Sequence, residues 1–249
     1  MALRTQPFER IILLGGSSEI GLAIVGCTSA PHATICLVGR PGPRQAAAAE
    51  HLRSRGHTVT EAAYDTAMTF TQTQDVLMVA KDLLGGPTTR IDAIIMAIGT
   101  MGDPLTPEAT LGTNLVGPAL LILSSQRVLG SQGSGSLIVL SSAAAVRPRE
   151  SILFYAMAKQ GIDTLARTTT ESMKSQGVRT LIVRPGFVST TMTAHLRPPP
   201  FSSTPSATAR HVARALKGRK GVIWVPGILR WVILTLRFLP RSLLPGSLR

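Results

Sequence analysis

Acidic residues are missing from the last third of this chain, because no Asp or Glu follows Glu171. Thirteen Lys and Arg residues lie beyond that position, whereas residues 1–171 hold 13 basic and 13 acidic residues and carry no net charge. The whole formal charge of +13 therefore belongs to the C-terminal third. This asymmetry indicates an anionic partner, which could be a phospholipid surface, a phosphorylated substrate or nucleic acid. A bias toward arginine is the alternative, although it does not explain the missing acids.

Cysteine and aromatic residues are also scarce. Cys27 and Cys36 are the only cysteines, and their spacing fits no metal or redox motif, so we expect neither a disulfide framework nor a metal site. Aromatic residues make up 4% of the chain, which disfavours a single-strand nucleic-acid binder that relies on stacking. We therefore expect no nucleic-acid partner.

Long apolar runs are absent as well. The N-terminal residues MALRTQPFER lack the apolar core of a secretion signal, and no run is long enough to span a bilayer. We therefore expect a cytoplasmic protein, or one that is peripherally associated with a membrane.

Short apolar runs alternate with stretches of helical spacing along the chain. Such alternation predicts βαβ units with right-handed crossovers and a parallel sheet. We therefore expect an α/β protein in which residues 1–249 form a single Rossmann-type domain, a doubly wound parallel sheet with helices on both faces. A substrate loop with helices is expected at about 190–217, and a basic, apolar C-terminal helix at about 227–249. The predicted strands are 11–14, 34–38, 91–97, 136–140 and 180–183, and the predicted helices are 18–28, 44–55, 73–84, 108–130 and 154–176.

The first predicted strand ends in a glycine-rich turn, residues 15–21 (GGSSEIG), which opens the first predicted helix. A turn that receives a pyrophosphate needs glycine where the backbone approaches the ligand and where the helix packs on the strand. The free N–H groups and the positive dipole end of the helix then face the phosphates. The spacing matches neither G-x-G-x-x-G nor a P-loop, so an ordinary turn is the alternative.

A tyrosine and a lysine four residues apart, Tyr155 and Lys159, lie near the start of a predicted helix and face the same way. A nearby ammonium favours the tyrosine anion, so the pair can exchange a proton near neutral pH. Ser142 ends a buried strand, where its hydroxyl could polarise a carbonyl. Asn114 lies within a predicted helix, where asparagine is a poor helix former and indicates a kink or a water site.

In the order and spacing of these motifs the chain resembles the short-chain dehydrogenase/reductase family, over essentially its whole length. The Pro-Gly turn at residues 184–190 (RPGFVST) belongs to the same resemblance. It implies hydride transfer between a nicotinamide cofactor and an alcohol or ketone. The catalytic roles that it implies are those of Tyr155 as acid/base, Ser142 orienting the substrate carbonyl, Lys159 lowering the tyrosine pKa and holding the nicotinamide ribose, and Asn114 anchoring a water in the proton relay.

The resemblance also implies which residues contact the cofactor. Val188 and Thr190 would contact the nicotinamide carboxamide, and Asp65 the adenine. The chain departs from the family at Glu19, where many members have glycine, and at residues 97–99 (AIG), which replace an asparagine-bearing turn. The first departure could alter how the pyrophosphate is covered. The expected cofactor-binding residues are Gly15, Ser17, Ser18, Glu19, Ile20, Gly21, Arg40, Asp65, Gly99, Tyr155, Lys159, Val188 and Thr190.

The choice between the two nicotinamide cofactors depends on the end of the second predicted strand. A carboxylate there would bind the ribose hydroxyls of NAD(H), whereas an arginine would accept the 2′-phosphate of NADP(H). Here Arg40 follows Val38 and Gly39, and no acid occurs before Glu50. Electrostatics therefore favours NADP(H), although the branch of the family described next is associated with NADH.

Residues 13–24, 184–186, 192–196 and 224–242 resemble one branch of the family, the reductases of decaprenylphosphoryl-2-keto-β-D-erythro-pentose. That resemblance implies hydride transfer to the 2-keto group of a polyprenyl-phosphate-linked sugar, giving decaprenylphosphoryl arabinose for cell-wall arabinan. It also implies a flavin-dependent oxidase as partner. Homo-oligomers are expected because relatives commonly pair through the helices that carry the asparagine and the tyrosine.

Two other functions compete with this interpretation. A reductase of the same fold could act on a steroid, acyl or small carbonyl substrate, and the basic tail would then be incidental. A non-catalytic nucleotide-binding regulator could retain the fold. The presence of Asn114, Ser142, Tyr155 and Lys159 together argues against the regulator.

The tail contains an apolar segment, residues 228–239, that follows a Pro-Gly pair and is too short to cross a bilayer. On a helix, Arg230 and Arg237 share a face, with Trp231 and Phe238 beside them. This pattern suits an interfacial helix or the rim of a polyprenyl groove. A helix buried against the domain is the alternative.

Three residues are candidates for substrate contacts. Arg147 and Arg149 follow the strand that carries Ser142, and their guanidinium groups could bind a substrate phosphate. Solvated loop charges are the alternative. His195 lies in the loop after Thr190, where it could contact substrate or serve only the structure.

Overall fold

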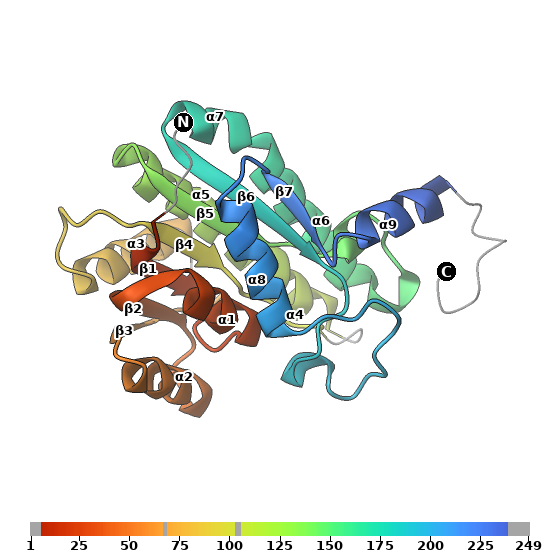
Figure 1. Ribbon diagram of the computed structural model, residues 1–249, viewed down its shortest axis with the longest axis horizontal. Helices are drawn as coiled ribbons and strands as arrows, with labels where there is room; N and C mark the ends of the chain where they lie inside the picture. Colours follow the sequence, from red (N-terminus) through yellow and green to blue (C-terminus); the bar gives the residue numbers. More distant parts are fainter. Residues whose placement is uncertain (1–5, 67–68, 103–105, 239–249) are drawn as a thin grey trace.

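The order of the strands determines where this fold can bind a ligand. In a computed structural model, which describes residues 6–66, 69–102 and 106–238, seven strands form one parallel sheet in the order β3-β2-β1-β4-β5-β6-β7 (Figure 1). The order reverses between β1 and β4, and ligands of such sheets bind there, outside the carboxyl ends of the strands. The strands are β1 (Phe8–Leu14), β2 (Ser29–Gly39), β3 (Thr58–Ala63), β4 (Ala93–Met96), β5 (Gly135–Leu140), β6 (Val178–Pro185) and β7 (Val222–Val225).

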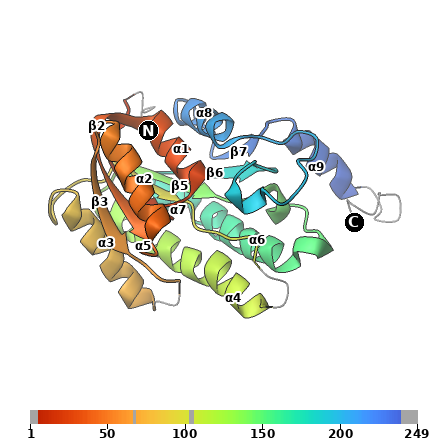
Figure 2. The same ribbon diagram turned by 90° about the horizontal axis from the view of Figure 1, so that it is seen from below.

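Helices cover both faces of the sheet. One apolar core includes side chains of α1 (Glu19–Thr28), α2 (Pro43–Ser54) and α8 (Pro205–Leu216). The other includes side chains of α3 (Phe70–Leu83), α5 (Gly117–Ser131) and α6 (Leu153–Thr168), and Figure 2 shows α8 and α6 on opposite sides of the sheet. The expected doubly wound architecture is therefore confirmed. Shorter helical segments are α4 (Pro107–Leu111), η1 (Gly112–Val116), η2 (Ala143–Ala145), η3 (Glu150–Ile152), α7 (Thr170–Ser175) and η4 (Thr191–Thr193).

The central strand explains why apolar runs without alternation predict buried strands here. Along β1, the side chains of Ile11 and Leu13 enter one core, and those of Ile12 and Leu14 enter the other. All four are fully buried. A strand covered by helices on both faces needs apolar residues at every position.

Four elements differ from the expectation. The edge strand β3 has only two buried residues among its six, and β7 has only four residues, so neither resembles a long buried run. The predicted helix at 108–130 is divided into α4, η1 and α5, because η1 is a π-helical turn. The predicted helix at 154–176 is divided into α6 and α7.

The tail forms α9 (Leu229–Phe238), and its first turns pack against the domain, whereas its role as an interfacial helix or the rim of a polyprenyl groove stays a prediction. Leu229 and the partly buried Ile233 pack against Trp224 of β7 and Ala143, the residue after Ser142. Trp231 lies on an exposed face, with 66% of its surface accessible. The side chains of Arg237 and Phe238 and residues 239–249 lie outside the part of the chain that the structure describes. Within that part, no helix has the length and apolar character to cross a membrane.

Candidate active site

Ser142, Tyr155 and Lys159 come together at the carboxyl ends of β4 and β5. Ser142 follows β5 closely, and its side chain forms a hydrogen bond with Tyr155 of α6. One turn further along α6, Lys159 donates hydrogen bonds from Nζ to the backbone oxygen of Leu140 at 3.1 Å and to that of Ile98 at 3.4 Å. The Lys159 ammonium thus joins the ends of two neighbouring strands and lies 5.8 Å from the centre of the Tyr155 ring.

The local electrostatics favour a protonated tyrosine beside a lysine that titrates near pH 8. Burial lowers the pKa of Lys159 to about 8. For Tyr155, desolvation raises the pKa above its ordinary value, and the hydrogen bond with Ser142 opposes that shift. At neutral pH the lysine is therefore largely cationic and the phenol keeps its proton, which prepares Tyr155 to donate that proton.

Asn114 lies inside the π-helical turn η1 and is fully buried. Its Oδ1 accepts a hydrogen bond from the backbone N–H of Thr100 at 2.8 Å, and its Nδ2 donates to the backbone oxygen of the same residue at 3.0 Å. Both ends of the side chain therefore hold the segment that follows β4. Single π-turns within helices often occur at functional sites. A π-helical turn is present where the sequence predicted a kink or a water site, and the role of Asn114 in anchoring a water stays a prediction.

Gly99 fills the space between Asn114 and Lys159. A Cβ atom at this position would lie 3.1 Å from Asn114 Oδ1 and 3.1 Å from Lys159 Nζ. Such contacts are tighter than ordinary van der Waals contacts, so a larger residue would displace one of the two side chains. The turn after β4 therefore lies against two of the predicted catalytic side chains.

The glycine-rich turn lies at the carboxyl end of β1, as a pyrophosphate site requires. Gly15 has a φ of 94°, and a Cβ atom there would approach the backbone of Ala97 to 2.9 Å. At Gly21, a Cβ atom would lie 2.7 Å from Leu13, so this glycine allows α1 to pack against β1. Ser18 caps α1 by accepting a hydrogen bond from the backbone N–H of Gly21 at 3.2 Å. The residues present therefore fit a dinucleotide whose phosphates face this helix N-terminus.

Glu19 connects that turn to the segment after β6. Its Oε1 accepts hydrogen bonds from the backbone N–H of Thr191 at 2.7 Å and from the Thr191 hydroxyl at 2.8 Å. Val188 is buried, and its backbone oxygen accepts a hydrogen bond from the Thr193 hydroxyl at 2.7 Å. The Glu19 carboxylate therefore bridges two walls of the predicted cofactor site, next to Thr190.

The remaining predicted cofactor contacts lie at the far end of this site. Arg40 follows β2 directly and is exposed, and Asp65 lies two residues beyond β3. The backbone N–H of Tyr64 donates to the backbone oxygen of Gly39 at 2.9 Å, so the ends of these two strands are adjacent. This arrangement puts Arg40 and Asp65 on the side of the turn where an adenosine would lie.

The predicted substrate residues lie on two segments. Arg147 and Arg149 follow η2, on the stretch that leads from Ser142 to α6, and Arg149 is exposed. His195 follows η4 and is also exposed. Their contacts with substrate stay predictions. Among the described residues, no group of His, Cys, Asp and Glu side chains could hold a metal ion.

Sequence reasoning missed a buried ionic cluster behind the catalytic residues. Asp163 of α6 binds the side chains of Ser141 and Arg184, and we call these three residues the Asp163 network. The half-exposed Arg167, on the same helix, also contacts the Asp163 carboxylate. The signal in the sequence was weak. Asp163 is an isolated acid four residues after Lys159, and Arg184 could only be seen as the residue before the Pro-Gly turn.

The comparisons with known proteins agree with this geometry. The sequence profile of the family described as short chain dehydrogenase matches residues 9–200. An uncharacterized oxidoreductase of Mycobacterium tuberculosis is 34% identical over 242 residues, which cover 93% of this chain and 94% of that protein.

Solved structures share the fold at lower identity. The 3-oxoacyl-[acyl-carrier protein] reductase of Brucella melitensis in complex with NAD has a TM-score of 0.73 and 19% identity, over 91% of this chain and 98% of that one. The gluconate 5-dehydrogenase of Burkholderia cenocepacia in complex with NADP and tartrate has a TM-score of 0.75 and 18% identity, over 92% and 97%. The matched profile, the related sequence and the shared architecture lead to one conclusion: the chain belongs to the short-chain dehydrogenase family of NAD(P)-dependent oxidoreductases.

Proposed function

We propose that this oxidoreductase works as an NAD(P)H-dependent ketone reductase, with Tyr155 as the proton donor. The observation that carries the proposal is the hydrogen bond between Tyr155 and Ser142 beside a buried, largely cationic Lys159. A bound nicotinamide supplies the hydride that reaches the carbonyl carbon. Tyr155 gives its phenolic proton to the carbonyl oxygen, and Ser142 orients that oxygen. The Lys159 ammonium stabilises the phenolate that remains, until a proton from solvent restores the phenol.

Replacing Tyr155 by phenylalanine tests this assignment. Tyr155→Phe removes only the proton donor, so we expect kcat for ketone reduction to fall by about 10²- to 10⁴-fold, the usual contribution of a general acid. The dissociation constant for NAD(P)H, measured by cofactor fluorescence, should change little. Turnover retained in this variant would remove Tyr155 from its role.

For the cofactor, we infer a preference for NADP(H). Arg40 supports this, because it is exposed directly after β2, where a 2′-phosphate would lie and where NAD-specific sites commonly have an acid. The first acidic residue after Arg40 is Glu50, within α2. The measurement is the ratio of kcat/KM for NADPH and NADH with the same ketone.

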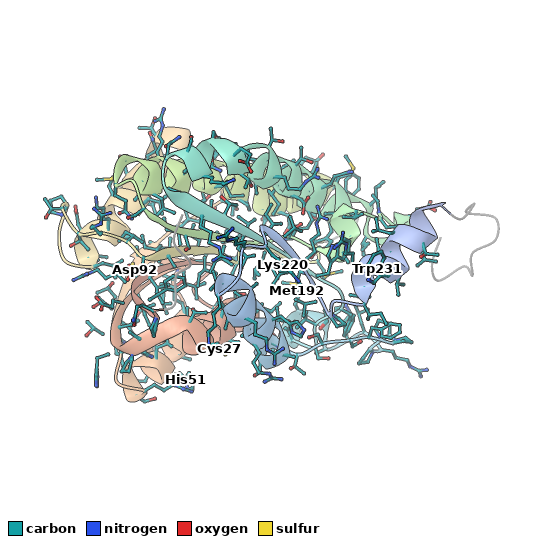
Figure 3. The ribbon with its side chains drawn as sticks, turned by 45° about the horizontal axis from the view of Figure 1, so that its top comes forward. Cys27, His51, Asp92, Met192, Lys220 and Trp231 are labelled. Atoms are coloured by element: carbon teal, nitrogen blue, oxygen red, sulfur yellow. The ribbon has the colours of Figure 1, made fainter. Side chains whose placement is uncertain are left out.

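For the substrate, we propose a ketone that carries an apolar chain and an anionic group. Exposed apolar side chains on the segment after β6 and on α9 support binding of the substrate's apolar chain. Two of them, Met192 and Trp231, are labelled in Figure 3. Leu229 of α9 touches Gly186 of the Pro-Gly turn, so the tail borders the same end of the sheet as the catalytic residues. Arg230 stacks on Trp231 at 5.3 Å and would attract the anionic group. Among the described residues, the exposed apolar side chains here are Met192, Leu196, Phe201, Ile228, which directly precedes α9, and Trp231.

Within that class, the resemblance in sequence favours decaprenylphosphoryl-2-keto-pentose as the substrate. A flavin-dependent oxidase that forms the keto-sugar would then be a partner, and an anionic membrane surface would present the polyprenyl chain to α9. Exposed Leu123 of α5 and Leu153 and Met157 of α6 support a homo-oligomer formed through these helices.

A substrate panel tests this choice. NAD(P)H oxidation is followed with the polyprenyl-phosphate-linked 2-keto-pentose, with the same keto-sugar phosphate without its chain, and with acyl, steroid and small cyclic ketones. We expect the linked sugar to have the highest kcat/KM, by at least tenfold over the chainless sugar. A higher value for an acyl or steroid ketone would assign the enzyme to the alternative class, and a highest value for a small polar ketone would refute the role of the apolar surface.

A further inference from the structure

We propose that Asp163 is a positioning residue of the reaction, which keeps the catalytic serine, the catalytic helix and the Pro-Gly turn in register. The inference rests on the proposed function, because it concerns the geometry of the same hydride and proton transfer. Asp163 lies one helical turn after Lys159 and two turns after Tyr155, on the buried face of α6. It touches none of the reacting groups and acts through its partners.

Ser141 and Arg184, the two partners of Asp163 in the network, belong to different catalytic elements. Its Oδ1 accepts a hydrogen bond from the Ser141 hydroxyl at 2.7 Å, and Ser141 precedes Ser142 directly. Arg184 donates from Nε to Oδ1 at 2.9 Å and from Nη2 to Oδ2 at 2.7 Å, and Arg184 directly precedes Pro185 and Gly186. One carboxylate thus joins α6 to the residues after β5 and to the end of β6.

The burial of this network makes its geometry rigid. The Asp163 side chain is 5% exposed and that of Arg184 is 11% exposed. Burial raises the pKa of Asp163, but the hydrogen bonds from Arg184 and Ser141 and the charges of Arg184 and Arg167 outweigh burial and hold the pKa below its ordinary value. The carboxylate therefore stays ionised, and the planar guanidinium binds it with two bonds, which fix the orientation as well as the distance.

Stability alone does not explain a buried ion pair at this place. Replacing such pairs by apolar residues of similar volume is often neutral or stabilising, because desolvation of the two charges offsets their attraction. What an ionic cluster adds is a defined arrangement of its partners. Here those partners flank the groups that must hold substrate and cofactor within about 0.5 Å of the productive geometry.

The network also reaches the tail. The guanidinium of Arg184 stacks on the Trp224 ring at 5.2 Å, and Trp224 packs against Leu229 of α9. Arg184 therefore contacts both Asp163 and Trp224. The tail reaches the network indirectly, because Leu229 packs against Trp224.

Asp163→Asn tests the proposal, with Arg167→Met as the matched control. Asparagine keeps the shape but loses the charge and one acceptor oxygen toward the guanidinium. Arg167→Met removes the one partner that lies on no catalytic strand; its side chain is 53% exposed and contacts Asp163 at 3.2 Å. We expect kcat to fall by about 10- to 100-fold in Asp163→Asn, as small misplacements of reacting groups do. We expect KM and the cofactor dissociation constant to change less than about threefold, and Arg167→Met to stay within about twofold of wild type.

A stability-matched variant separates positioning from folding. Leu52→Ala opens a cavity under α2, toward the opposite edge of the sheet from the Asp163 network. It should lower the melting temperature without changing any contact of the network. All variants are assayed at a temperature where circular dichroism shows them fully folded. A kcat in Asp163→Asn within twofold of wild type would overturn the proposal, as would an equal loss in Leu52→Ala.

Hydrogen exchange gives a reading that needs no turnover. In Asp163→Asn, amide exchange should accelerate together in residues 141–146 and 185–193, and in Arg167→Met it should not. Unchanged exchange of both segments in Asp163→Asn would refute the positioning role. A wild-type protein that reduces no carbonyl, while exchange responds as expected, would instead sink the proposed function.

Discussion

One carboxylate oxygen of Glu19 accepts two hydrogen bonds from Thr191, which lies 172 residues later in the sequence. The glycine at this position in many relatives could make neither bond. Because the glutamate begins α1 and the threonine begins η4, this bridge joins the helix N-terminus that is expected to face the pyrophosphate to the segment after β6.

The bridge predicts a measurable effect on the protein without cofactor. Glu19→Gly should accelerate amide exchange in residues 188–196 and speed both association and release of NAD(P)H, because the two walls are no longer joined. The cost in stability should be below about 1 kcal/mol, since the bonds are partly exposed to solvent. Thr191→Val, which keeps only the backbone bond, should show an intermediate effect, and unchanged exchange in both variants would contradict the bridge.

Arg40 predicts how the cofactors are distinguished. In Arg40→Ala, affinity for NADPH should fall by about tenfold or more, as expected for a lost charge-assisted contact worth about 1.5–3 kcal/mol, while affinity for NADH should stay nearly constant. Arg55→Ala, at the far end of α2, is the control. Equal losses for the two cofactors, measured by fluorescence titration, would refute the 2′-phosphate contact.

Gly99 predicts a steric effect on catalysis. Gly99→Ala places a methyl group 3.1 Å from both Asn114 Oδ1 and Lys159 Nζ, so one of these must shift and kcat should fall by about tenfold. Gly26→Ala is a fair comparison, because its Cβ atom meets nothing within 4 Å and alanine favours the helix. A Gly99→Ala enzyme with unchanged kcat would show that the turn after β4 tolerates the methyl group without moving catalytic side chains.

Lys159 predicts how stability depends on pH. Its pKa falls from 10.5 to about 8 on folding, so above pH 8 the unfolded chain binds more protons than the folded one, and stability should rise with pH. Above pH 9 the buried Cys36 thiol works in the opposite direction, because burial raises its pKa to about 11. The contribution of Lys159 is therefore clearest between pH 8 and 9, where it should reach about 1 kcal/mol.

Lys159→Met isolates that contribution. The difference in unfolding free energy between wild type and this variant, from urea titrations at pH 8 and 9, should change by the stated amount. The rate of ketone reduction by the wild type should also decline as pH rises through about 8, because the cation beside Tyr155 is lost. A reduction rate that stays constant to pH 10 would contradict the shifted pKa.

Sequence patterns predicted the parts of the fold whose causes are local. The uninterrupted apolar run at Ile11–Leu14 reports burial on both faces, and the glycines at 15 and 21 report close backbone approach. The Tyr155–Lys159 spacing gives a shared helix face. In each case a few neighbouring residues contain the information.

The parts that escaped prediction depend on contacts between distant segments. The π-turn at Asn114 accompanies two hydrogen bonds to Thr100, which follows another strand. Asp163 finds Arg184 only after β6 has paired with β5. The strands β3 and β7 at the two edges of the sheet were missed because β3 mixes polar residues with alanine and β7 is very short.

The packing of α9 against Trp224 and beside Gly186 has an evolutionary consequence. The helix beside the Pro-Gly turn belongs to a segment that is separate in sequence from Ser142, Tyr155 and Lys159. Exchange or drift of that segment could change which molecules are admitted while hydride transfer itself stays as it was. Relatives with the same core and a different segment at this place would then catalyse the same reaction on different substrates.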